Sequence, residues 1–239
     1  MKVSLFITCM CDLLTPEVGK DTVEILENVG CEVDFPMAQT CCGQPAYNSG
    51  HLHQSKRAMK HMMQVFKDST YVVGPSGSCI GMIKQYPRIF AGDPDWEDEA
   101  KKLASKSYEI CQFLVNVLKI EDVGSTFQGT VTYHSSCHMS RILGVTDAPM
   151  KLLSSVKGVE LIDLPHKEDC CGFGGTFAID QADISGEMVK EKTKHIKDTG
   201  ANYLVGADMA CLINIKGRMD REGMTTKVKH ITHILNTNS

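Results

Sequence analysis

The cysteines of this chain recur in the same order in its two halves, and this repeat limits the folds open to the chain. Each half carries a lone cysteine, then a Cys-Cys-Gly triplet, then a further cysteine. Equivalent positions (9 and 137, 41 and 170, 79 and 211) are 128, 129 and 132 residues apart. A spacing this constant indicates duplication of one structural unit. The two sets are Cys9, Cys41, Cys42 and Cys79 in the first half, and Cys137, Cys170, Cys171 and Cys211 in the second.

The apolar pattern between the cysteines predicts alternating strands and helices, which is typical of an α/β protein with parallel sheets. In the first half we expect strands at Lys2–Thr8, Cys31–Phe35 and Tyr71–Gly74, and helices at Glu17–Val29, at His51–Phe66, from Gly77 and, as one long or broken helix, at Asp95–Leu118. In the second half we expect strands at Thr130–His134, Val159–Leu164 and Tyr203–Val205, and helices at Ala148–Val156, Asp183–Thr199, Asp208–Met219 and Ile231–Leu235.

The length of the chain also fits a division into two halves. Its 239 residues are enough for one large domain or for two of about 120 residues. Gly124, Ser125 and Gly129 interrupt the periodic pattern near the middle. We therefore expect two pseudo-symmetric, Rossmann-like halves, residues 1–124 and 125–239, each with a parallel sheet and with its cysteine loops at the carboxyl ends of the strands.

This arrangement would gather the cysteines of each half at one place. Loops that follow parallel strands converge on the carboxyl edge of the sheet, so three strands can present four thiolates to one point. Adjacent cysteines in an extended chain point to opposite sides, and Gly43 and Gly172 permit the bend that lets both face one centre. An iron–sulfur cluster accommodates neighbouring ligands more easily than a single tetrahedral zinc ion does. An iron–sulfur cluster is therefore the first hypothesis, and a Cys₄ zinc site is the second.

Two further explanations of the cysteines stay open. The chain begins without an export signal, so a reducing, cytoplasmic environment is expected and a disulfide framework is disfavoured. One alternative is thiol–disulfide chemistry at the two vicinal pairs. The other is a metal-free scaffold in which the cysteines are small buried apolar residues. Cys11, Cys31 and Cys111 have no counterpart in the other half and are interpreted as packing residues.

Composition and short motifs exclude several classes of function. The net charge is −4 and no basic stripe is present, so a nucleic acid is not an expected partner. No stretch approaches the roughly 20 apolar residues of a transmembrane helix, so membrane association is expected only through partners. The glycines at 172, 174 and 175 do not form a G-x-G-x-x-G motif and no Walker lysine follows them, so neither an NAD site nor another nucleotide site is expected.

The motifs around the cysteines carry a resemblance to known families. Each half resembles the cysteine-rich CCG domain, which occurs in heterodisulfide reductase and in the iron–sulfur subunit of glycolate oxidase. Over nearly the whole chain the sequence is similar to the lactate utilization protein A family of oxidoreductase subunits. The segments that carry this similarity are Phe35-Pro36, Gln39–Ala46 (QTCCGQPA), Gly74–Cys79 (GPSGSC), Tyr133–His138 (YHSSCH) and Cys170–Gly175 (CCGFGG).

The resemblance implies a role in growth on L-lactate. The chain would act with two further proteins in an NAD-independent complex that oxidises lactate to pyruvate, as the subunit that passes electrons through iron–sulfur clusters towards a quinone or another acceptor. It implies one cluster per half, bound by the eight cysteines named above, and it leaves open whether the chain is itself catalytic and whether both halves are occupied.

One departure from the CCG pattern bears on the cluster type. The general pattern ends in Cys-x-x-Cys, whereas Met82 and Asn214 stand in the last place here. Each half therefore lacks the last thiolate of a five-cysteine, non-cubane cluster. A four-cysteine [4Fe–4S] cluster fits the remaining set, and so does a half that has lost its cluster and keeps only the fold.

Three polar residues near the lone cysteine of the second half are candidates for a supporting role. His134 and His138 flank Cys137, and Arg141 follows on the same expected turn. They could donate hydrogen bonds to a cluster or bind a carboxylate. The alternative is that they cap the helix that follows.

Overall fold

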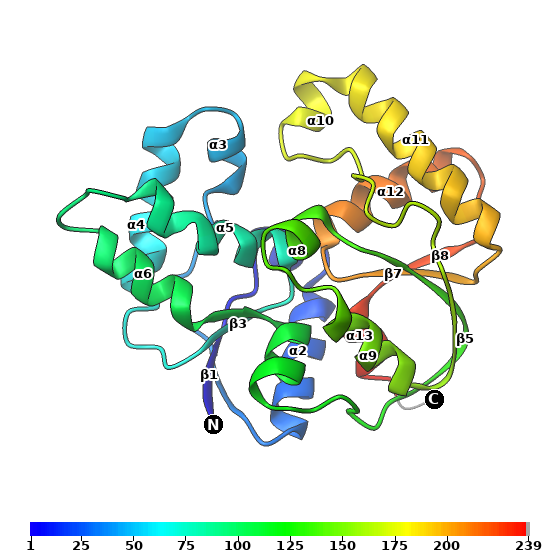
Figure 1. Cartoon of the computed structure of the whole chain (residues 1–239), viewed down its shortest axis with the longest axis horizontal. Helices are drawn as coiled ribbons and strands as arrows, with labels where there is room; N and C mark the ends of the chain where they lie inside the picture. The colour runs from blue at the N-terminus through cyan, green and yellow to red at the C-terminus, as the bar shows by residue number, and fades with distance from the viewer. Residues whose placement is uncertain (238–239) are drawn as a thin grey trace.

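The computed structural model describes residues 1–237 and consists of two similar α/β halves, each built on a four-stranded sheet (Figure 1). The strand order is β2-β1-β3-β4 in the first half and β6-β5-β7-β8 in the second, so equivalent strands occupy equivalent places. Every strand pair is parallel. The predicted α/β class with two pseudo-symmetric halves is confirmed. Residues 238–239, the end of the predicted second half, lie outside the described residues.

The first half alternates strands and helices up to its fourth strand. Its strands are β1 (Lys2–Leu5), β2 (Glu32–Asp34), β3 (Val72–Gly74) and β4 (Ser107–Glu109). Its helices are α1 (Cys9–Leu14), α2 (Pro16–Asn28), α3 (Gln44–Asn48), α4 (Leu52–Val65), α5 (Gly77–Ile89), α6 (Glu97–Lys106) and α7 (Ile110–Gln112), which continues into the π-helical turn η1 (Phe113–Val117).

The second half repeats this order. Its strands are β5 (Thr126–His134), β6 (Lys157–Ile162), β7 (Tyr203–Gly206) and β8 (Lys227–His230). Its helices are α8 (Cys137–Arg141), α9 (Asp147–Ser155), α10 (Phe177–Asp180), α11 (Ala182–Thr199), α12 (Met209–Arg221) and α13 (Ile231–Leu235).

The fourth strand of each sheet differs from what the sequence predicts. The segment Asp95–Leu118, expected as one long or broken helix, contains strand β4, which pairs with β3 through Val72–Ser107, Val73–Tyr108 and Gly74–Glu109. Its counterpart β8 lies in a segment to which the pattern assigns no strand. Both strands are short edge strands, and their pairing with a buried central strand outweighs the helix propensity of the Ala-, Lys- and Glu-rich sequence around β4.

The loops after the cysteines are also more structured than expected. The first strand ends at Leu5 rather than at Thr8, and helix α1 begins at Cys9. Three further short helices, α3, α8 and α10, follow cysteine segments that the pattern left as loops. Such one- to two-turn helices are too short to show a repeating apolar face, which is why the sequence does not reveal them.

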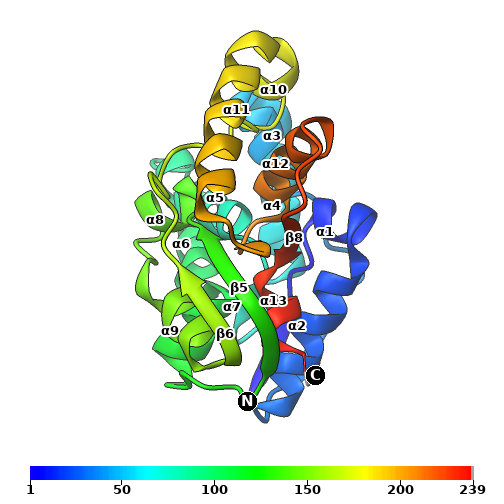
Figure 2. The same cartoon turned by 90° about the vertical axis from the view of Figure 1, so that its right-hand side faces the viewer.

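The two halves share one apolar core. The largest cluster of buried side chains includes Ile25 and Phe113 of the first half together with Leu152 and Ile234 of the second. Helix α2 packs against α13, α5 against α8, and α7 against α9, and each of these pairs joins the two halves. Figures 1 and 2 show α3 and α10 near the top of the molecule, whereas both termini lie toward the bottom.

None of the helices within residues 1–237 combines the length and the apolar character that crossing a membrane requires.

Candidate metal centres

Each Cys-Cys-Gly triplet bends at its glycine and is held by the same hydrogen bond in both halves. Gly43 and Gly172 have φ angles of 85° and 82°, in the left-handed region that favours glycine. The carbonyls of these glycines accept hydrogen bonds from the hydroxyls of Ser55 on α4 and Ser185 on α11, both at 2.8 Å. A Cβ atom at Gly172 would lie 2.7 Å from the carbonyl oxygen of Ser185, so a larger residue does not fit. The bend expected at the two glycines is therefore present.

The remaining cysteines lie at the starts of helices that face these loops. Cys9 and Cys137 are the first residues of α1 and α8, directly after the central strands β1 and β5. Cys79 and Cys211 lie in the first turns of α5 and α12, which follow β3 and β7. The carboxyl edge of each sheet therefore supplies all four cysteines of a set, as the topology of parallel strands predicts.

The sulfur atoms of each set form a series of neighbouring pairs. In the first half, the thiols of Cys9 and Cys41, of Cys41 and Cys42, and of Cys42 and Cys79 are close enough to shift each other's pKa. In the second half the same holds for Cys137 and Cys170, for Cys170 and Cys171, and for Cys171 and Cys211, in the same order. The structure thus brings together all eight cysteines that the sequence singles out, as two separate groups of four.

The first cysteine of each vicinal pair has a lowered pKa, whereas the pKa of the second is raised. Hydrogen bonds from Cys42 and Cys9 hold the pKa of the Cys41 thiol well below its ordinary value, and the backbone N–H of Gly43 donates to the same sulfur at 3.4 Å. Hydrogen bonds from Cys137 and Cys171 lower the pKa of Cys170 in the same way. A lowered pKa favours the thiolate, which is the form that ligates a metal.

Different residues occupy the place of the missing fifth cysteine in the two halves. Met82 is buried in the apolar cluster that also contains Cys42. Asn214 instead donates a hydrogen bond to the carbonyl oxygen of Cys171 at 2.8 Å. In the first half the equivalent carbonyl, that of Cys42, accepts from the hydroxyl of Tyr86 at 2.7 Å. Asn214 therefore supports the loop of the second half, whereas in the first half Tyr86 does so and Met82 belongs to the apolar cluster.

The two groups of cysteines are connected by polar contacts across the halves. The side chain of Gln44, two residues after Cys42, lies 2.9 Å from Nε2 of His138. Nδ1 of His138 lies 3.4 Å from the sulfur of Cys137. The backbone N–H of Gly43, the residue before Gln44, donates to the sulfur of Cys41. A continuous series of contacts thus runs from Cys41 to Cys137.

A buried carboxylate that the sequence analysis did not single out lies between the two groups. Asp208 is 2% exposed and accepts a hydrogen bond from the backbone N–H of Ser78 at 2.8 Å, although Ser78 belongs to the other half. Burial raises the pKa of the Cys11 thiol to about 12, and the nearby charge of Asp208 acts in the same direction. Asp208 lies 132 residues after Ser76, the same spacing as between Cys79 and Cys211. This spacing is the sequence signal that marks Asp208 as part of the second site.

The other candidate residues are placed as follows. His134 is 1% exposed at the end of β5, beside Cys171 and Cys211. Arg141 is exposed and donates a hydrogen bond to the carbonyl oxygen of Glu168 at 3.0 Å, so it contacts the backbone before Cys170. The packing cysteines lie outside both groups: Cys31 and Cys111 are in the shared core, and Cys11 is buried beside α2.

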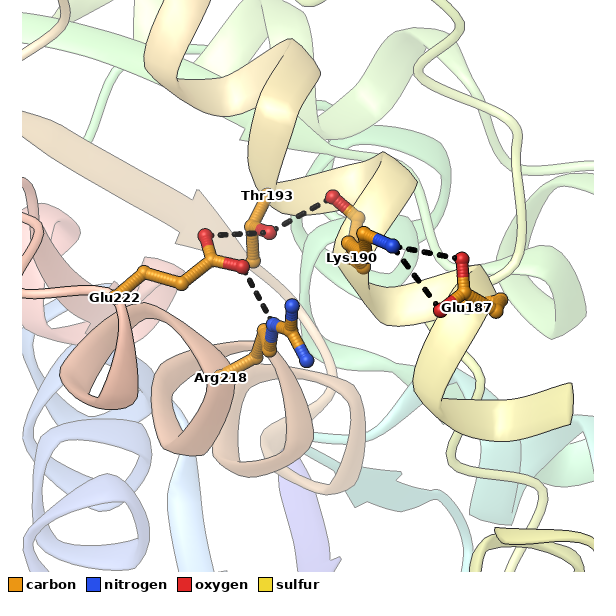
Figure 3. A network of polar contacts seen from close by, with 5 residues as sticks. All are labelled: Glu187, Lys190, Thr193, Arg218 and Glu222. Carbon is orange, nitrogen blue, oxygen red and sulfur yellow. Dashed lines mark hydrogen bonds and ion pairs between the residues drawn. The ribbon is translucent and has the colours of Figure 1, made fainter. Parts of the chain in front are cut away.

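A polar network fixes helix α11 against the end of α12 (Figure 3). The hydroxyl of Thr193 lies 3.2 Å from a carboxylate oxygen of Glu222, and Glu222 also pairs with Arg218. Lys190 pairs with Glu187 on the exposed side of α11 at 3.0 Å. Because α11 carries Ser185 and α12 carries Cys211, this network holds together two helices that shape the second group of cysteines.

Comparisons with known proteins agree with this arrangement. The family model of the cysteine-rich domain CCG matches residues 3–84 and 131–216, and each segment contains one complete set of four cysteines. Lactate utilization protein A of Oceanobacillus iheyensis is 68% identical over 237 residues, which cover 99% of this chain and 97% of that protein. The chain belongs to the lactate utilization protein A family. The resemblance predicted from the motifs is confirmed.

Other members of the lactate utilization protein A family are similar over their whole length. The protein of that name from Geobacillus kaustophilus is 61% identical and the one from Bacillus subtilis 57% identical, and each alignment covers 99% of this chain. The Bacillus subtilis protein is covered completely. The chain therefore corresponds to the family over its full extent, with both cysteine groups included.

Proposed function

We propose that this chain is the iron–sulfur subunit of a complex that oxidises L-lactate to pyruvate without NAD, and that it transfers electrons within that complex. The observation that carries the proposal is the presence of two equivalent groups of four neighbouring thiols at the sheet edges. The lactate role rests on the relatives, which bear the name lactate utilization protein A.

The donor set fits a cluster bound by cysteine thiolates. All four donors in each group are sulfur atoms, and Gly43 and Gly172 each direct a backbone N–H at one of them. Cysteine thiolates are the usual ligands of [4Fe–4S] clusters, and N–H groups directed at the sulfurs adjust the reduction potential. When bound, such a cluster supplies one-electron transfer. We assign one [4Fe–4S] cluster to each half, with Cys9, Cys41, Cys42 and Cys79 as ligands in the first, and Cys137, Cys170, Cys171 and Cys211 in the second.

The chain's own residues would join the two centres. Gln44 and His138 connect the loop of the first half to the lone cysteine of the second. A second contact between the two halves joins the hydroxyls of Ser49 and Thr176, which are 2.6 Å apart. These contacts fix the two groups of thiols relative to each other, which favours transfer within one chain.

The proposed partners follow from the family. Two further proteins of lactate utilization would complete the complex, with a quinone or another acceptor reached through them. Any association with a membrane would occur through these partners.

The experiment that tests the proposal is a measurement of iron and acid-labile sulfide, with electron paramagnetic resonance, on anaerobically purified protein. Cys41→Ser and Cys170→Ser would each remove about half of the iron if each half holds a cluster. Cys31→Ser is the matched control, because Cys31 is buried away from both groups. Zinc without labile sulfide would support the zinc scaffold, and a metal-free protein whose vicinal thiols oxidise reversibly would support thiol–disulfide chemistry.

A further inference from the structure

The sheet register makes His134 the second-half counterpart of Phe6. Strand β5 pairs with β7 through Tyr133–Val205 and His134–Gly206, and β1 pairs with β3 through Leu5–Val73. Phe6 follows this last pair, with its N–H donating to the carbonyl of Val73 at 2.8 Å. The lone cysteine of each half comes three residues after this position. An imidazole therefore occupies, in the second half, a place that holds a phenyl ring in the first.

Phe6 has suitable apolar neighbours, whereas His134 lacks hydrogen-bond partners. Phe6 lies in the apolar cluster with Cys42, and its ring packs edge-to-face against Phe66 with 6.0 Å between centroids. His134 is 1% exposed, and neither of its ring nitrogens has a hydrogen-bond partner among the described residues. A buried polar group without a partner costs about 1 to 3 kcal/mol, so a histidine at this place calls for an interaction that residues 1–237 do not supply.

The nearest groups to the imidazole are two thiols. One ring nitrogen of His134 and the sulfur atoms of Cys171 and Cys211 all lie within 4.8 Å of one another. Within residues 1–237, this is the one set of three histidine, cysteine or acidic ligand atoms that lie so close together. Imidazole nitrogen and thiolate sulfur are the pair of donors that iron, zinc and cobalt accept together.

The buried ammonium group of Lys192, also in the second half, already has a hydrogen-bond partner. Lys192 on α11 is 1% exposed, and its ammonium group donates to the carbonyl of His166 at 2.7 Å. It occupies the place of Met62, since both follow the loop-binding serines Ser55 and Ser185 by seven residues. Lys192 therefore serves the backbone before the cysteine pair. His134, like the hydroxyl of Ser136 beside Cys211, is buried near the thiols without a hydrogen-bond partner among the described residues.

We propose that a ring nitrogen of His134 is a ligand of the metal centre in the second half, beside Cys171 and Cys211, so that the two halves hold centres of different ligation. The inference rests on the proposed function for the identity of the metal, but the nitrogen–thiolate site itself does not depend on iron. A neutral imidazole adds no negative charge where a thiolate would, and histidine ligands raise the reduction potential of iron–sulfur centres. With His134 the second group offers five donors, four thiols and one imidazole, against four thiols in the first.

Pulsed electron paramagnetic resonance on the iron-loaded, anaerobically reduced protein tests the ligand directly. A ¹⁴N coupling of the size produced by a metal-bound imidazole is expected in the unmodified protein and absent from His134→Phe, which inserts the residue of the first half. His138→Gln is the matched control, because His138 is the other imidazole beside these thiols. Iron in the second half without this coupling, or a coupling that persists in His134→Phe, would overturn the inference.

Cobalt binding provides a readout that does not require iron. Metal-free, reduced protein with Cys9→Ser and Cys42→Ser, which disable the first group, would be titrated with Co²⁺ and followed by thiolate-to-cobalt absorption. His134→Phe and His134→Gln should both weaken Co²⁺ binding by at least about tenfold, the lower end of what loss of a supporting residue costs at metal sites. His138→Gln should weaken it less. Equal affinity in all variants would contradict a role of His134 as ligand.

The two measurements separate this inference from the proposed function. Iron and labile sulfide in both halves, with no effect of His134→Phe on either readout, would leave the iron–sulfur function standing and remove the histidine ligand. A protein that binds no iron but loses cobalt affinity in His134→Phe would keep the nitrogen–thiolate site and remove the iron–sulfur function. Thermal unfolding of each variant shows whether it is folded like the unmodified protein. If the phenyl ring of His134→Phe is too large for the site, His134→Gln, which keeps a polar group, replaces it in both measurements.

Discussion

At the scale of single residues, a side-chain hydrogen bond holds the carbonyl of the second cysteine in each vicinal pair. The hydroxyl of Tyr86 is fully buried and donates to the carbonyl of Cys42 at 2.7 Å. Tyr86→Phe leaves that carbonyl without its donor, and we expect it to lower the free energy of unfolding by about 1 to 2 kcal/mol. Urea unfolding of the metal-free, reduced protein measures this change.

Tyr133→Phe is the control for this prediction. Tyr133 is also buried, but its hydroxyl has no hydrogen-bond partner among residues 1–237. Removing that hydroxyl should leave the free energy of unfolding unchanged or raise it, because the cost of burying a polar group without a partner is removed. If Tyr133→Phe lowered the free energy of unfolding as much as Tyr86→Phe does, the hydrogen bond to the carbonyl of Cys42 would not be the cause of the effect.

The buried carboxyl of Glu109 makes stability depend on pH. Burial raises the pKa of Glu109 from its ordinary value to about 8, even though the N–H groups of Cys111 and Gln112 donate to Oε2. Below a pH of about 4.5 both folded and unfolded chains carry the proton, and the contribution of Glu109 to stability is at its greatest. As the pH rises towards 8 the unfolded chain loses the proton first, so stability falls by a few kcal/mol at most.

The variant Glu109→Gln tests this dependence because it is neutral throughout. Its free energy of unfolding should fall less than that of the unmodified protein between pH 5 and pH 8, as measured by urea unfolding at each pH. Identical slopes for the two proteins would mean that Glu109 is ionised in the folded chain at neutral pH.

The residues of the candidate site could be predicted to different degrees from the sequence. The eight cysteines and the bends at Gly43 and Gly172 follow from the repeated spacing and from the conformational freedom of glycine. The contact of Gln44 with His138 and the burial of Asp208 against Ser78 could not be predicted, because each joins residues of different halves. Only the relative placement of the two sheets brings these groups together.

At the scale of secondary-structure elements, the network between α11 and α12 contains both a buried and an exposed contact (Figure 3). Thr193 is fully buried, and its hydroxyl contacts Glu222 and the carbonyl of Lys190. Thr193→Val nearly keeps the volume but removes both hydrogen bonds of a buried hydroxyl, so we expect a loss of about 1 kcal/mol in the free energy of unfolding. Thermal or urea unfolding measures it.

Lys190→Gln is the matched control on the same helix. Its partner Glu187 is exposed, and exposed ion pairs of this kind contribute between about 0 and 1 kcal/mol. The variant should therefore unfold within about 0.5 kcal/mol of the unmodified protein. If Lys190→Gln cost as much as Thr193→Val, the exposed part of the network would be as important as the buried part.

The elements that the sequence predicted best are those with a long apolar face. Helices α2, α4 and α11 lie within one residue of their predicted ends. The predicted final helix Ile231–Leu235 is also present as α13, although it has only five residues. Strands β4 and β8 were missed because each is an edge strand of three or four residues with few apolar side chains. Their existence depends on the neighbouring strand, which a local pattern does not contain.

At the scale of the whole molecule, the two halves depend on each other for their cores. Phe113 and Leu114 of the first half belong to the same buried cluster as Leu152 and Ile231 of the second. Polar groups cross the boundary as well, since the N–H of Gly77 donates to the carbonyl of Ala207 at 3.2 Å. The predicted boundary at residues 124–125 thus marks a repeat of topology, and we infer that it does not mark two independently stable units.

Separate expression of residues 1–124 and 125–239 tests this dependence. Alone, each fragment would expose the apolar faces of α2 and α7 or of α9 and α13, and would leave unpaired the polar groups that meet across the boundary. We therefore expect each fragment to lack a cooperative unfolding transition, and a mixture refolded together to regain one, because mixing restores the shared core. Circular dichroism during urea unfolding distinguishes the outcomes, and the intact chain is the control. If a fragment unfolds cooperatively on its own, with an m-value that fits its size, that half is an independently stable domain. The shared core would then not be needed for its stability.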